Sequence, residues 1–232
     1  MVDLQNYYDE RVKALNADQQ LEQVGHTVSG KAISDQEFDR LIDEIVALLL
    51  LDRNDNLLDL CCGNGRITRE ISNYCNQATA VDFSQEMISN ANLLNSRDNI
   101  VYCQSDVLQL KSLGLPLNHY SKVLMYGGLQ HFTEGKFEDL IALIRAHCSD
   151  QFVIIFGFVP NAKRKWDFYD TLAKKIRYLF YRITRRDVLG TWWSKNKISI
   201  YTDLAGLSCQ FVDVPSGRYG HPYRFHAVIS NR

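Results

Sequence analysis

Short apolar runs alternate with helix-like segments through the middle of the chain, and this alternation constrains the fold more than any other feature. The apolar runs cover residues 57–62, 78–83, 100–103, 122–126 and 152–158. Helix-like stretches stand between or after them at 66–74, 84–95 and 133–147. Strands that alternate with helices at this spacing form a parallel sheet with helices on both faces. The sequence therefore predicts a three-layer α/β fold.

The end of the chain breaks this rhythm. Residues 211–214 and 223–229 read as two strands, separated only by residues 215–222. A parallel crossover needs a longer connection, so this spacing predicts an antiparallel hairpin. Residues 160–196 are aromatic and basic and belong to no simple strand–helix unit. They are the natural place for a cap that contacts a substrate.

A helix precedes the first predicted strand. Ser34 and Glu37 have the spacing of a capping box, and apolar residues recur at helical spacing from Phe38 to Leu49. We expect one domain over residues 1–232, in which residues 1–53 form an N-terminal helical cap and residues 160–196 form the insertion.

Composition excludes several classes of protein. The chain of 232 residues has 26 Lys and Arg and 27 Asp and Glu, so the formal net charge of −1 does not indicate a nucleic-acid partner. The longest apolar run, residues 45–51, is far shorter than the roughly 20 residues of a membrane helix. The N-terminus lacks the pattern of a signal peptide. These features predict a soluble, cytoplasmic protein.

Six cysteines are scattered along the chain, without a C-x-x-C spacing. Metal sites need clustered ligands, and the sequence has none, so we expect no metal.

A glycine-containing turn joins the first predicted strand to its helix. In LLDLCCGNGRIT (residues 57–68), the sequence Gly63-Asn64-Gly65 lets the backbone approach a ligand, and the new helix offers free N–H groups. A dinucleotide fingerprint would have a third glycine where this chain has Thr68. Asp59 would repel a pyrophosphate, whereas it would attract an ammonium or sulfonium group.

Two more acids follow the next two strands. Asp82 is placed to accept hydrogen bonds from both hydroxyls of a ribose, and Asp106 to bind the exocyclic amine of an adenine. Phe83 or Val107 would pack on the adenine ring. Each acid alone is as readily a helix cap or a loop residue. Together with Asp59, they would face one crevice at the carboxyl ends of three parallel strands.

With this set of residues the chain resembles the class I S-adenosylmethionine-dependent methyltransferases. Their first strand ends in an acid followed by small residues and glycines, here Asp59-Leu60-Cys61-Cys62-Gly63-Asn64-Gly65. Asp82 and Asp106 match the acids that follow their second and third strands. The resemblance covers about residues 34–158, and the terminal hairpin fits the reversed last strand of their seven-stranded, mostly parallel sheet. The departure is Cys62, where many members have glycine.

The resemblance implies S-adenosylmethionine as cofactor and S-adenosylhomocysteine as product. It assigns the methionine part of the cofactor to the turn that includes Cys61, Gly63 and Gly65, with Asp59 near the amino group. The N-terminal segment around Tyr8 and Arg11 resembles a lead-in that folds over the cofactor in small-molecule members. Tyr8 or Arg11 would then reach the cofactor's carboxylate. The alternative is an ordinary amphipathic helix.

The loop after the fourth strand borders the transferred methyl group in this family. Here it contains Tyr126, Gln130 and His131. We expect Tyr126 to contact the cofactor and Gln130 the acceptor. His131 is the candidate general base, because an unperturbed pKa near 6.5 suits proton transfer near neutrality. Alternatively, Gln130 and His131 only cap or pack the following helix. Methyl transfer can proceed without a general base, because positioning of the reactants supplies much of its rate.

Four further residues are candidates for the acceptor pocket. The loop between the last two strands contributes Tyr219 and His221, and the insertion contributes Trp166 and Tyr169. The insertion and the tail loosely resemble small methyltransferases of bacterial polysaccharide or secondary-metabolite synthesis. That likeness is carried by Gly190-Thr191-Trp192-Trp193 and Tyr223-Arg224-Phe225.

The insertion carries local positive charge. Residues 163–186 contain nine Lys or Arg and two Asp, a net charge of +7 that leaves −8 for the rest of the chain. Leu172, Ile176, Leu179 and Ile183 recur at helical spacing, so the stretch is amphipathic. Such a helix meets anionic lipid, nucleic acid or a phosphorylated substrate, or is simply a solvated helix face.

The sequence therefore predicts a methyltransferase enzyme that acts on an oxygen or nitrogen of a small acceptor, with sugar-like and phosphorylated acceptors as the expected classes. The first alternative is an RNA or tRNA methyltransferase. The second is an inactive methyltransferase fold that serves as a binding protein.

Overall fold

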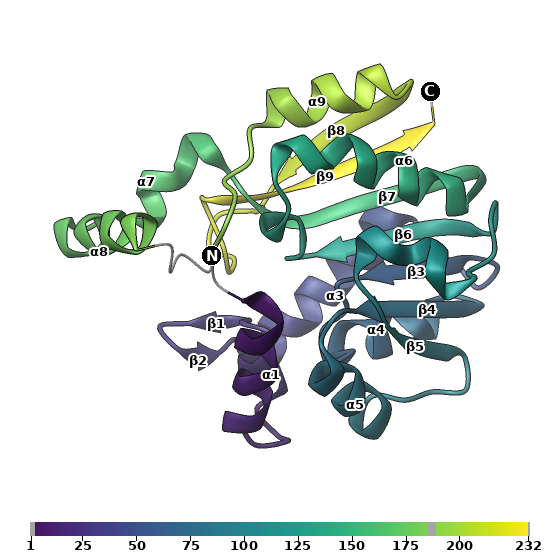
Figure 1. Ribbon diagram of the computed structural model, residues 1–232, viewed down its shortest axis with the longest axis horizontal. Coiled ribbons are helices and arrows are strands. Elements are labelled where there is room, and N and C mark those ends of the chain that lie inside the picture. Colours follow the sequence, from purple (N-terminus) through teal and green to yellow (C-terminus); the bar gives the residue numbers. More distant parts are fainter. Residues whose placement is uncertain (1–2, 185–188, 232) are drawn as a thin grey trace.

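A seven-stranded sheet forms the centre of the protein in the computed structural model, which describes residues 3–184 and 189–231 (Figure 1). Its strands run in the order β5-β4-β3-β6-β7-β9-β8. They are β3 (Asn56–Leu60), β4 (Gln77–Asp82), β5 (Ile100–Gln104), β6 (Tyr120–Tyr126), β7 (Cys148–Pro160), β8 (Leu207–Asp213) and β9 (Arg224–Asn231). Strand β9 lies between β7 and β8 and is antiparallel to both, whereas the pairs from β5 to β7 are parallel. The predicted three-layer Rossmann-like fold, with its reversed last strand, is confirmed.

Helices cover both faces of this sheet. One face packs against α6 (Phe137–His147), α9 (Lys195–Leu204) and the 3₁₀ segment η2 (Val107–Leu113). The other packs against α3 (Asp35–Leu49) and α4 (Arg66–Ile71), which continues into the 3₁₀ segment η1 (Ser72–Tyr74). Helix α5 (Gln85–Leu94) connects β4 to β5.

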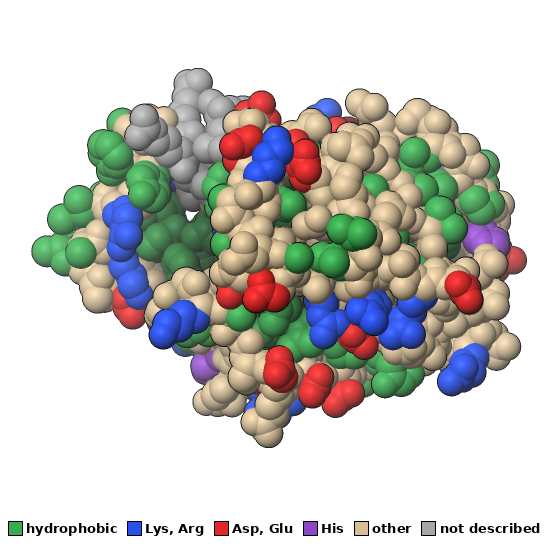
Figure 2. Space-filling model, turned by 90° about the horizontal axis from the view of Figure 1, so that it is seen from below, with side chains coloured by type: hydrophobic (Ala, Val, Ile, Leu, Met, Phe, Trp, Pro, Cys, Tyr) green, Lys and Arg blue, Asp and Glu red, His purple; other side chains and the backbone are tan. Residues whose placement is uncertain are grey.

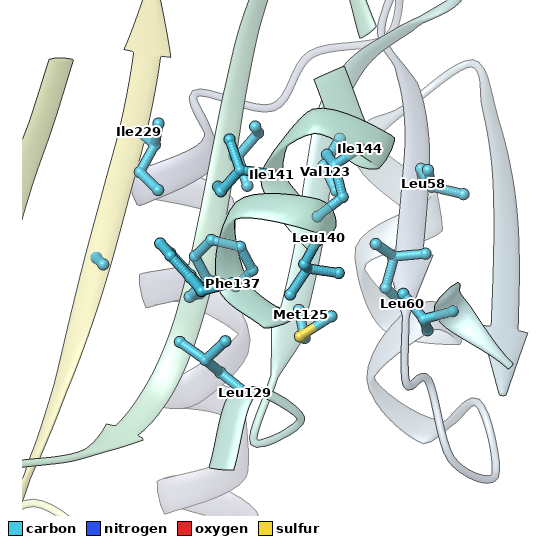
Figure 3. Close-up of a cluster of buried hydrophobic side chains, with 14 of the residues drawn as sticks. Leu58, Leu60, Val123, Met125, Leu129, Phe137, Leu140, Ile141, Ile144 and Ile229 are labelled. Atoms are coloured by element: carbon cyan, nitrogen blue, oxygen red, sulfur yellow. The ribbon is translucent and has the colours of Figure 1, made fainter. Parts of the chain in front are cut away.

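Burial on both faces explains why the central strands read as continuous apolar runs. Leu58 and Leu60 of β3 point to the α6 face, whereas Leu57 between them points to the α3 face. Figure 3 shows the α6 face, where Phe137, Leu140, Ile141 and Ile144 pack over β3 and β6. Side chains of a strand alternate between faces, so a strand buried on both sides needs apolar residues at every position.

The N-terminal segment forms a separate cap beside the sheet. It comprises α1 (Leu4–Ala14), α2 (Gln20–Gln23) and a hairpin of β1 (Thr27–Val28) and β2 (Lys31–Ala32), which the sequence did not predict. Figure 1 shows α1 and this hairpin on the side toward which the β6 arrow points. The cap therefore lies at the carboxyl edge of the parallel strands.

The predicted capping box is only half formed. The Ser34 hydroxyl accepts a hydrogen bond from the Glu37 N–H at 3.2 Å and begins α3 as expected. The Glu37 carboxylate instead accepts from the Arg218 Nε at 2.7 Å and from the Tyr219 N–H at 2.9 Å. Glu37 thus ties α3 to the loop between β8 and β9, a long-range contact that local spacing does not reveal.

The predicted insertion contains the 3₁₀ segment η5 (Ala162–Arg164) and two helices, α7 (Lys165–Phe168) and α8 (Leu172–Ile183). Trp193 anchors its end: the side chain is fully buried, and its Nε1 donates to the Leu129 carbonyl at 3.0 Å. Helix α9 follows and was not predicted, because among its residues only Ile198 and Thr202 are buried.

Within residues 3–184 and 189–231, no helix combines the length and apolar character needed to span a bilayer.

The packing of α6 on the sheet yields a stability prediction. Leu140 is fully buried against the sheet, so Leu140→Ala should lower the free energy of unfolding by about 2–5 kcal/mol through lost transfer energy and a residual cavity. The same change at Leu93, which is 76% exposed on α5, should cost less than about 0.5 kcal/mol. Urea denaturation of both variants measures this difference, and equal losses would contradict the assigned core.

Candidate active site

A pocket of about 550 Å³ opens at the carboxyl edge of the sheet. Loops that follow β3, β4, β5 and β6 line it, together with α1 and the start of β9. Strand β9 runs opposite to its neighbours, so its first residues meet the last residues of the parallel strands at this same edge. Of the sequence-predicted residues, twelve line the pocket: Tyr8, Asp59, Cys61, Gly63, Asp82, Phe83, Asp106, Val107, Tyr126, Gln130, His131 and Tyr219.

The glycine turn between β3 and α4 is closely packed. Gly63 and Gly65 adopt left-handed backbone conformations, with φ of 56° and 73°. A Cβ at Gly63 would stand 2.7 Å from Val24 Cγ1, and one at Gly65 would stand 2.5 Å from the Tyr102 hydroxyl oxygen. Both positions therefore require glycine.

The backbone strain of this turn lies at Cys61. Within this turn, Cys61 is a non-glycine residue in the left-handed conformation, with φ of 58°, and it lines the pocket. The sequence analysis had marked Cys62 as the departure from glycine. A left-handed conformation is costly for a residue with a Cβ, so the strain lies at Cys61.

Asp82 holds two turns together at the pocket. Its Oδ2 accepts from the Gly63 N–H at 2.9 Å, and its Oδ1 accepts from the Ser84 N–H at 3.0 Å. Ser84 in turn caps α5 by accepting from the Met87 N–H at 3.1 Å. Each carboxylate oxygen can accept a second hydrogen bond, so these contacts leave Asp82 able to bind a ligand.

The other two predicted acids stand on either side of Asp82 along the edge. Asp59 is 3% exposed and accepts from the Thr68 hydroxyl at 2.6 Å. Asp106 begins η2 and accepts from the Leu108 N–H at 2.9 Å. The order of the strands places the three acids in succession, as the sequence predicted.

Burial makes this part of the pocket electrostatically unusual. It raises the pKa of Asp59 to about 7, although the Thr68 hydrogen bond lowers that pKa in part. Burial likewise raises the pKa of Asp82 to about 6, against the hydrogen bonds from the Ser84 and Gly63 N–H groups. Carboxylates with raised pKa values favour a cationic ligand, because a positive charge stabilises their ionised form.

The N-terminal helix α1 closes one side of the pocket. Leu4, Gln5 and Tyr8 line the pocket from this helix. Asp9, on the same helix, accepts hydrogen bonds from the Ser84 hydroxyl and from the Glu86 N–H, so α1 is attached to the start of α5.

Tyr8 and His131 meet across the pocket. The Tyr8 hydroxyl lies 3.0 Å from His131 Nε2. Burial and, as a smaller contribution, the Arg224 charge together lower the pKa of His131 to about 4. His131 is therefore neutral near pH 7, and it is a weaker base than the value near 6.5 assumed from the sequence.

Aromatic rings line the side of the pocket next to β7 and β9. Phe158 stacks between Tyr126 and Tyr219, at centroid distances of 5.5 Å and 4.6 Å. His26 approaches the same three rings, and burial lowers its pKa to about 4. Arg224 lies over the Phe158 ring, with Cζ 4.7 Å from the centroid.

Five predicted residues do not line the pocket. Gly65 begins α4 behind the turn, and Arg11 donates to the Glu22 carbonyl and the Tyr7 hydroxyl within the cap. Trp166 is half exposed, and Tyr169 is buried among aromatic rings of the insertion. His221 Nδ1 lies 2.8 Å from the carbonyl oxygen of Val214. Arg185 and Arg186 of the basic segment lie outside the described residues.

Sequence reasoning did not identify several residues of the site, among them four with polar or aromatic side chains. His26 and Phe158 line the pocket without belonging to a recognisable motif, and Arg224, which also lines it, belongs to the quoted segment Tyr223-Arg224-Phe225 but was given no role there. Asn64 lies inside the glycine turn and is fully buried, and its Nδ2 donates to Gln20 and Gln23 of the N-terminal cap. The only available signal was the position of Asn64 between two glycines.

Among the described residues, no cluster of three or more His, Cys, Asp or Glu is arranged to hold a metal ion.

Residues 57–151, which supply β3 to α6, match the family described as "Methyltransferase domain". An uncharacterized RNA methyltransferase from Chlorobaculum tepidum is 28% identical over 90 residues, which are 38% of this chain and 19% of that protein. The chain thus spans about a fifth of the length of this relative.

Two solved structures share the fold over their whole lengths. A SAM-dependent methyltransferase from Anabaena variabilis has a TM-score of 0.68 at 21% identity and covers all of this chain and 96% of its own. The N-methyltransferase NodS from Bradyrhizobium japonicum, in complex with S-adenosylhomocysteine, has a TM-score of 0.68 at 14% identity, covering 99% of each chain. The resemblance to class I methyltransferases is therefore confirmed, in fold throughout and in sequence over residues 57–151.

The raised pKa of Asp59 yields a prediction for stability against pH. A carboxyl group with a pKa above its unfolded value binds its proton more tightly in the folded protein, so its contribution to stability is lost as pH rises. Between pH 4 and pH 7, the free energy of unfolding of the wild-type protein should fall by on the order of 1–3 kcal/mol relative to that of Asp59→Asn. Thermal or urea denaturation across this range measures it, with Asp139→Asn on the surface as control. A difference that does not change with pH would contradict the burial of Asp59.

Proposed function

We propose that this protein is a class I methyltransferase that binds S-adenosylmethionine at the acidic part of its pocket and methylates an oxygen or nitrogen of a small acceptor. The observation that carries this proposal is the arrangement of Asp59, Asp82 and Asp106 beside the glycine turn at one edge of the sheet. The family match over these strands and the shared fold support it.

The acidic residues suit the charge of the cofactor. S-adenosylmethionine carries a sulfonium and an ammonium group. Asp59 and Asp82 are buried with raised pKa values, and a cation beside them would stabilise their ionised forms. By resemblance, Asp82 binds the ribose, Asp106 the adenine amine, and Phe83 and Val107 the adenine ring.

The glycine turn suits the methionine part of the cofactor. Gly63 leaves space beside Val24 that a side chain would fill, and Cys61 and Tyr126 line the pocket nearby. Tyr8 closes this pocket from α1, in agreement with the N-terminal segment folding over the cofactor. Arg11 is held within the cap and does not enter this proposal.

The acceptor side is the part lined by Gln130, His131 and Tyr219. When bound, the cofactor supplies an electrophilic methyl group. We propose that Gln130 and Tyr219 orient the acceptor and that neutral His131 accepts the acceptor's proton at Nδ1, which has no hydrogen-bond partner among the described residues, while its Nε2–H donates to the Tyr8 hydroxyl oxygen and holds the imidazole in place. The lowered pKa of His131 makes this proton transfer efficient only for an acceptor that is itself acidic.

The domain organisation also enters the proposal. One methyltransferase domain would comprise the whole chain, with an N-terminal helical cap at residues 1–53, of which the part before α3 would cover the cofactor, and the insertion at 160–196 near the acceptor entrance. Trp166, Tyr169 and His221 would then act at the entrance and not inside the pocket, because they lie away from its lining.

RNA methylation is less well supported. The relative from Chlorobaculum tepidum that is named as an RNA methyltransferase aligns with only 90 residues of this chain, which are 19% of its own length. An inactive methyltransferase fold that only binds a partner is also less well supported, because Asp59 and Asp82 retain positions and burial suited to a cationic ligand.

Calorimetry with S-adenosylmethionine and S-adenosylhomocysteine tests this function. We expect micromolar binding by the wild-type protein, and a loss of at least about 100-fold in Asp82→Ala, which removes a buried charged acceptor. Asp139→Ala removes an exposed carboxylate and is the matched control.

Because Asp82 also holds two turns, circular dichroism must show that the Asp82→Ala variant is folded. Unchanged affinity in that folded variant would contradict the proposed cofactor site, and an absence of binding by the wild-type protein would contradict the proposed function.

A further inference from the structure

Arg224 is a buried cation in the pocket without an acidic partner. Its side chain is 7% exposed, and no carboxylate of the described residues forms an ion pair with it. Nη1 donates to Gln130 Oε1 at 2.9 Å and to the Phe158 carbonyl at 2.8 Å. The buried Nε has no hydrogen-bond partner among the described residues. A buried charge left in this state costs stability, which indicates a site that is completed by a ligand.

Arg218, six residues earlier in the same segment, shows the usual arrangement. Its Nε lies 2.7 Å from Glu37 Oε1, and its Nη2 lies 3.6 Å from Glu44 Oε2. Arg218 precedes β9 and Arg224 begins it, but of the two only Arg218 is neutralised by carboxylates. The unpaired charge of Arg224 therefore does not follow from its position in the chain alone.

The groups around Arg224 are neutral. Tyr8, Tyr126 and Tyr219 have raised pKa values, chiefly through burial, so they remain protonated near pH 7. His26 and His131 have lowered pKa values and are uncharged. Nothing on this side of the pocket compensates the guanidinium, which also loses hydration through burial.

The sheet separates this charge from the acids. Asp59 lies near the end of β3, Asp82 ends β4 and Asp106 follows β5, whereas Arg224 begins β9, beyond β6 and β7 in the strand order. The pocket is therefore acidic at one end and basic at the other. A cationic cofactor suits the acidic end, so the basic end is left for the second substrate.

We propose that Arg224 binds an anionic group, a carboxylate or a phosphate, of the acceptor. This inference rests on the proposed methyltransferase function and narrows its substrate class. A guanidinium fixed by Gln130 and by the Phe158 carbonyl presents its remaining N–H groups in a fixed direction, which suits the paired oxygens of these anions. The aromatic rings of Tyr126, Phe158 and Tyr219 would contact the apolar part of the same molecule.

Small anions test this proposal without a known acceptor. With the protein saturated by S-adenosylhomocysteine, inorganic phosphate and acetate should bind in the millimolar range, as followed by NMR line broadening. Arg224→Met should weaken this binding by about tenfold or more, and Arg224→Lys should restore part of it. Arg177→Met, on the exposed surface of α8, removes the same charge and should leave the binding unchanged.

The unaltered protein provides a second test, because acetamide has the shape of acetate without its charge. Acetamide binding as tight as acetate would overturn the proposal, as would phosphate binding that is unchanged in Arg224→Met. If Arg224 held the cofactor's carboxylate instead, Arg224→Met would weaken S-adenosylhomocysteine but not methylthioadenosine, which lacks that carboxylate; this result would also overturn it. Failure of S-adenosylhomocysteine to bind the wild-type protein would contradict the underlying function separately.

Helix α8 projects from the body of the molecule (Figure 1). None of its side chains is buried. Leu172, Ile176, Leu179 and Ile183 share one face at helical spacing and are 54–82% exposed. The opposite face carries Tyr178, which packs on Tyr169 at 4.5 Å. The apolar stripe therefore points away from the protein.

The charges on α8 indicate what covers this stripe. The helix has Lys174, Lys175, Arg177 and Arg182 and contains no Asp or Glu. Figure 2 shows hydrophobic side chains gathered at this end of the molecule, with Lys and Arg beside them. An apolar stripe flanked by cations is the pattern of helices that lie in the surface of an anionic membrane. We infer that α8 docks on an anionic lipid surface, independently of the reaction that the pocket performs.

Vesicle sedimentation tests this inference. Wild-type protein should bind phosphatidylcholine vesicles that contain about 30% phosphatidylglycerol, more weakly at high salt, and should bind pure phosphatidylcholine at least about tenfold less. The double variant Ile176→Ser and Leu179→Ser should bind the anionic vesicles about tenfold or more weakly. The control variant Leu93→Ser with Leu204→Ser changes exposed residues of other helices and should bind as tightly as the wild-type protein. Binding unaffected by the α8 variant would overturn the inference. Two other results would also overturn the inference, if the wild-type protein does not bind vesicles: dimerisation in sedimentation velocity that the α8 variant abolishes, or retention on an RNA column that the α8 variant abolishes.

Discussion

The geometry of the pocket depends on two hydrogen bonds that the Asp82 carboxylate accepts. Their donors are backbone N–H groups from the turn after β3 and from the start of α5, so one buried acid fixes two strand-to-helix connections. The same acid faces the cavity, and burial raises its pKa to about 6. Structure and ligand binding therefore share one group: the backbone donors stabilise its charge in the free protein, and a cationic ligand would complete that stabilisation.

The separation of charge along the sheet edge organises the rest of the site. Acids follow the strands from β3 to β5, a neutral aromatic layer follows β6 and β7, and Arg224 begins β9. This order requires the reversal of β9, because only an antiparallel strand brings its first residue to the edge where the parallel strands end. The reversed strand thus contributes a residue to the pocket that no parallel strand in its place could contribute.

Local patterns in the sequence predicted the acidic end well. The three acids at the carboxyl ends of β3, β4 and β5 lie together, because strand periodicity and the carboxyl-edge rule determine their positions. Arg224 and Phe158 escaped prediction, since their roles arise from the pairing of β7 with β9 over about 65 residues of sequence. The pKa of His131 could not be inferred either, because it depends on burial and on Arg224.

Crystallographic structure determination of the complex with S-adenosylhomocysteine tests the central claim most directly. The account predicts the ribose within hydrogen-bond distance of Asp82, the adenine beside Asp106, and the sulfur directed toward Tyr126 and the aromatic side of the pocket. Arg224 should make no contact with the ligand's carboxylate. An adenosine bound against Tyr219 and Arg224, with the three acids uncontacted, would contradict the account.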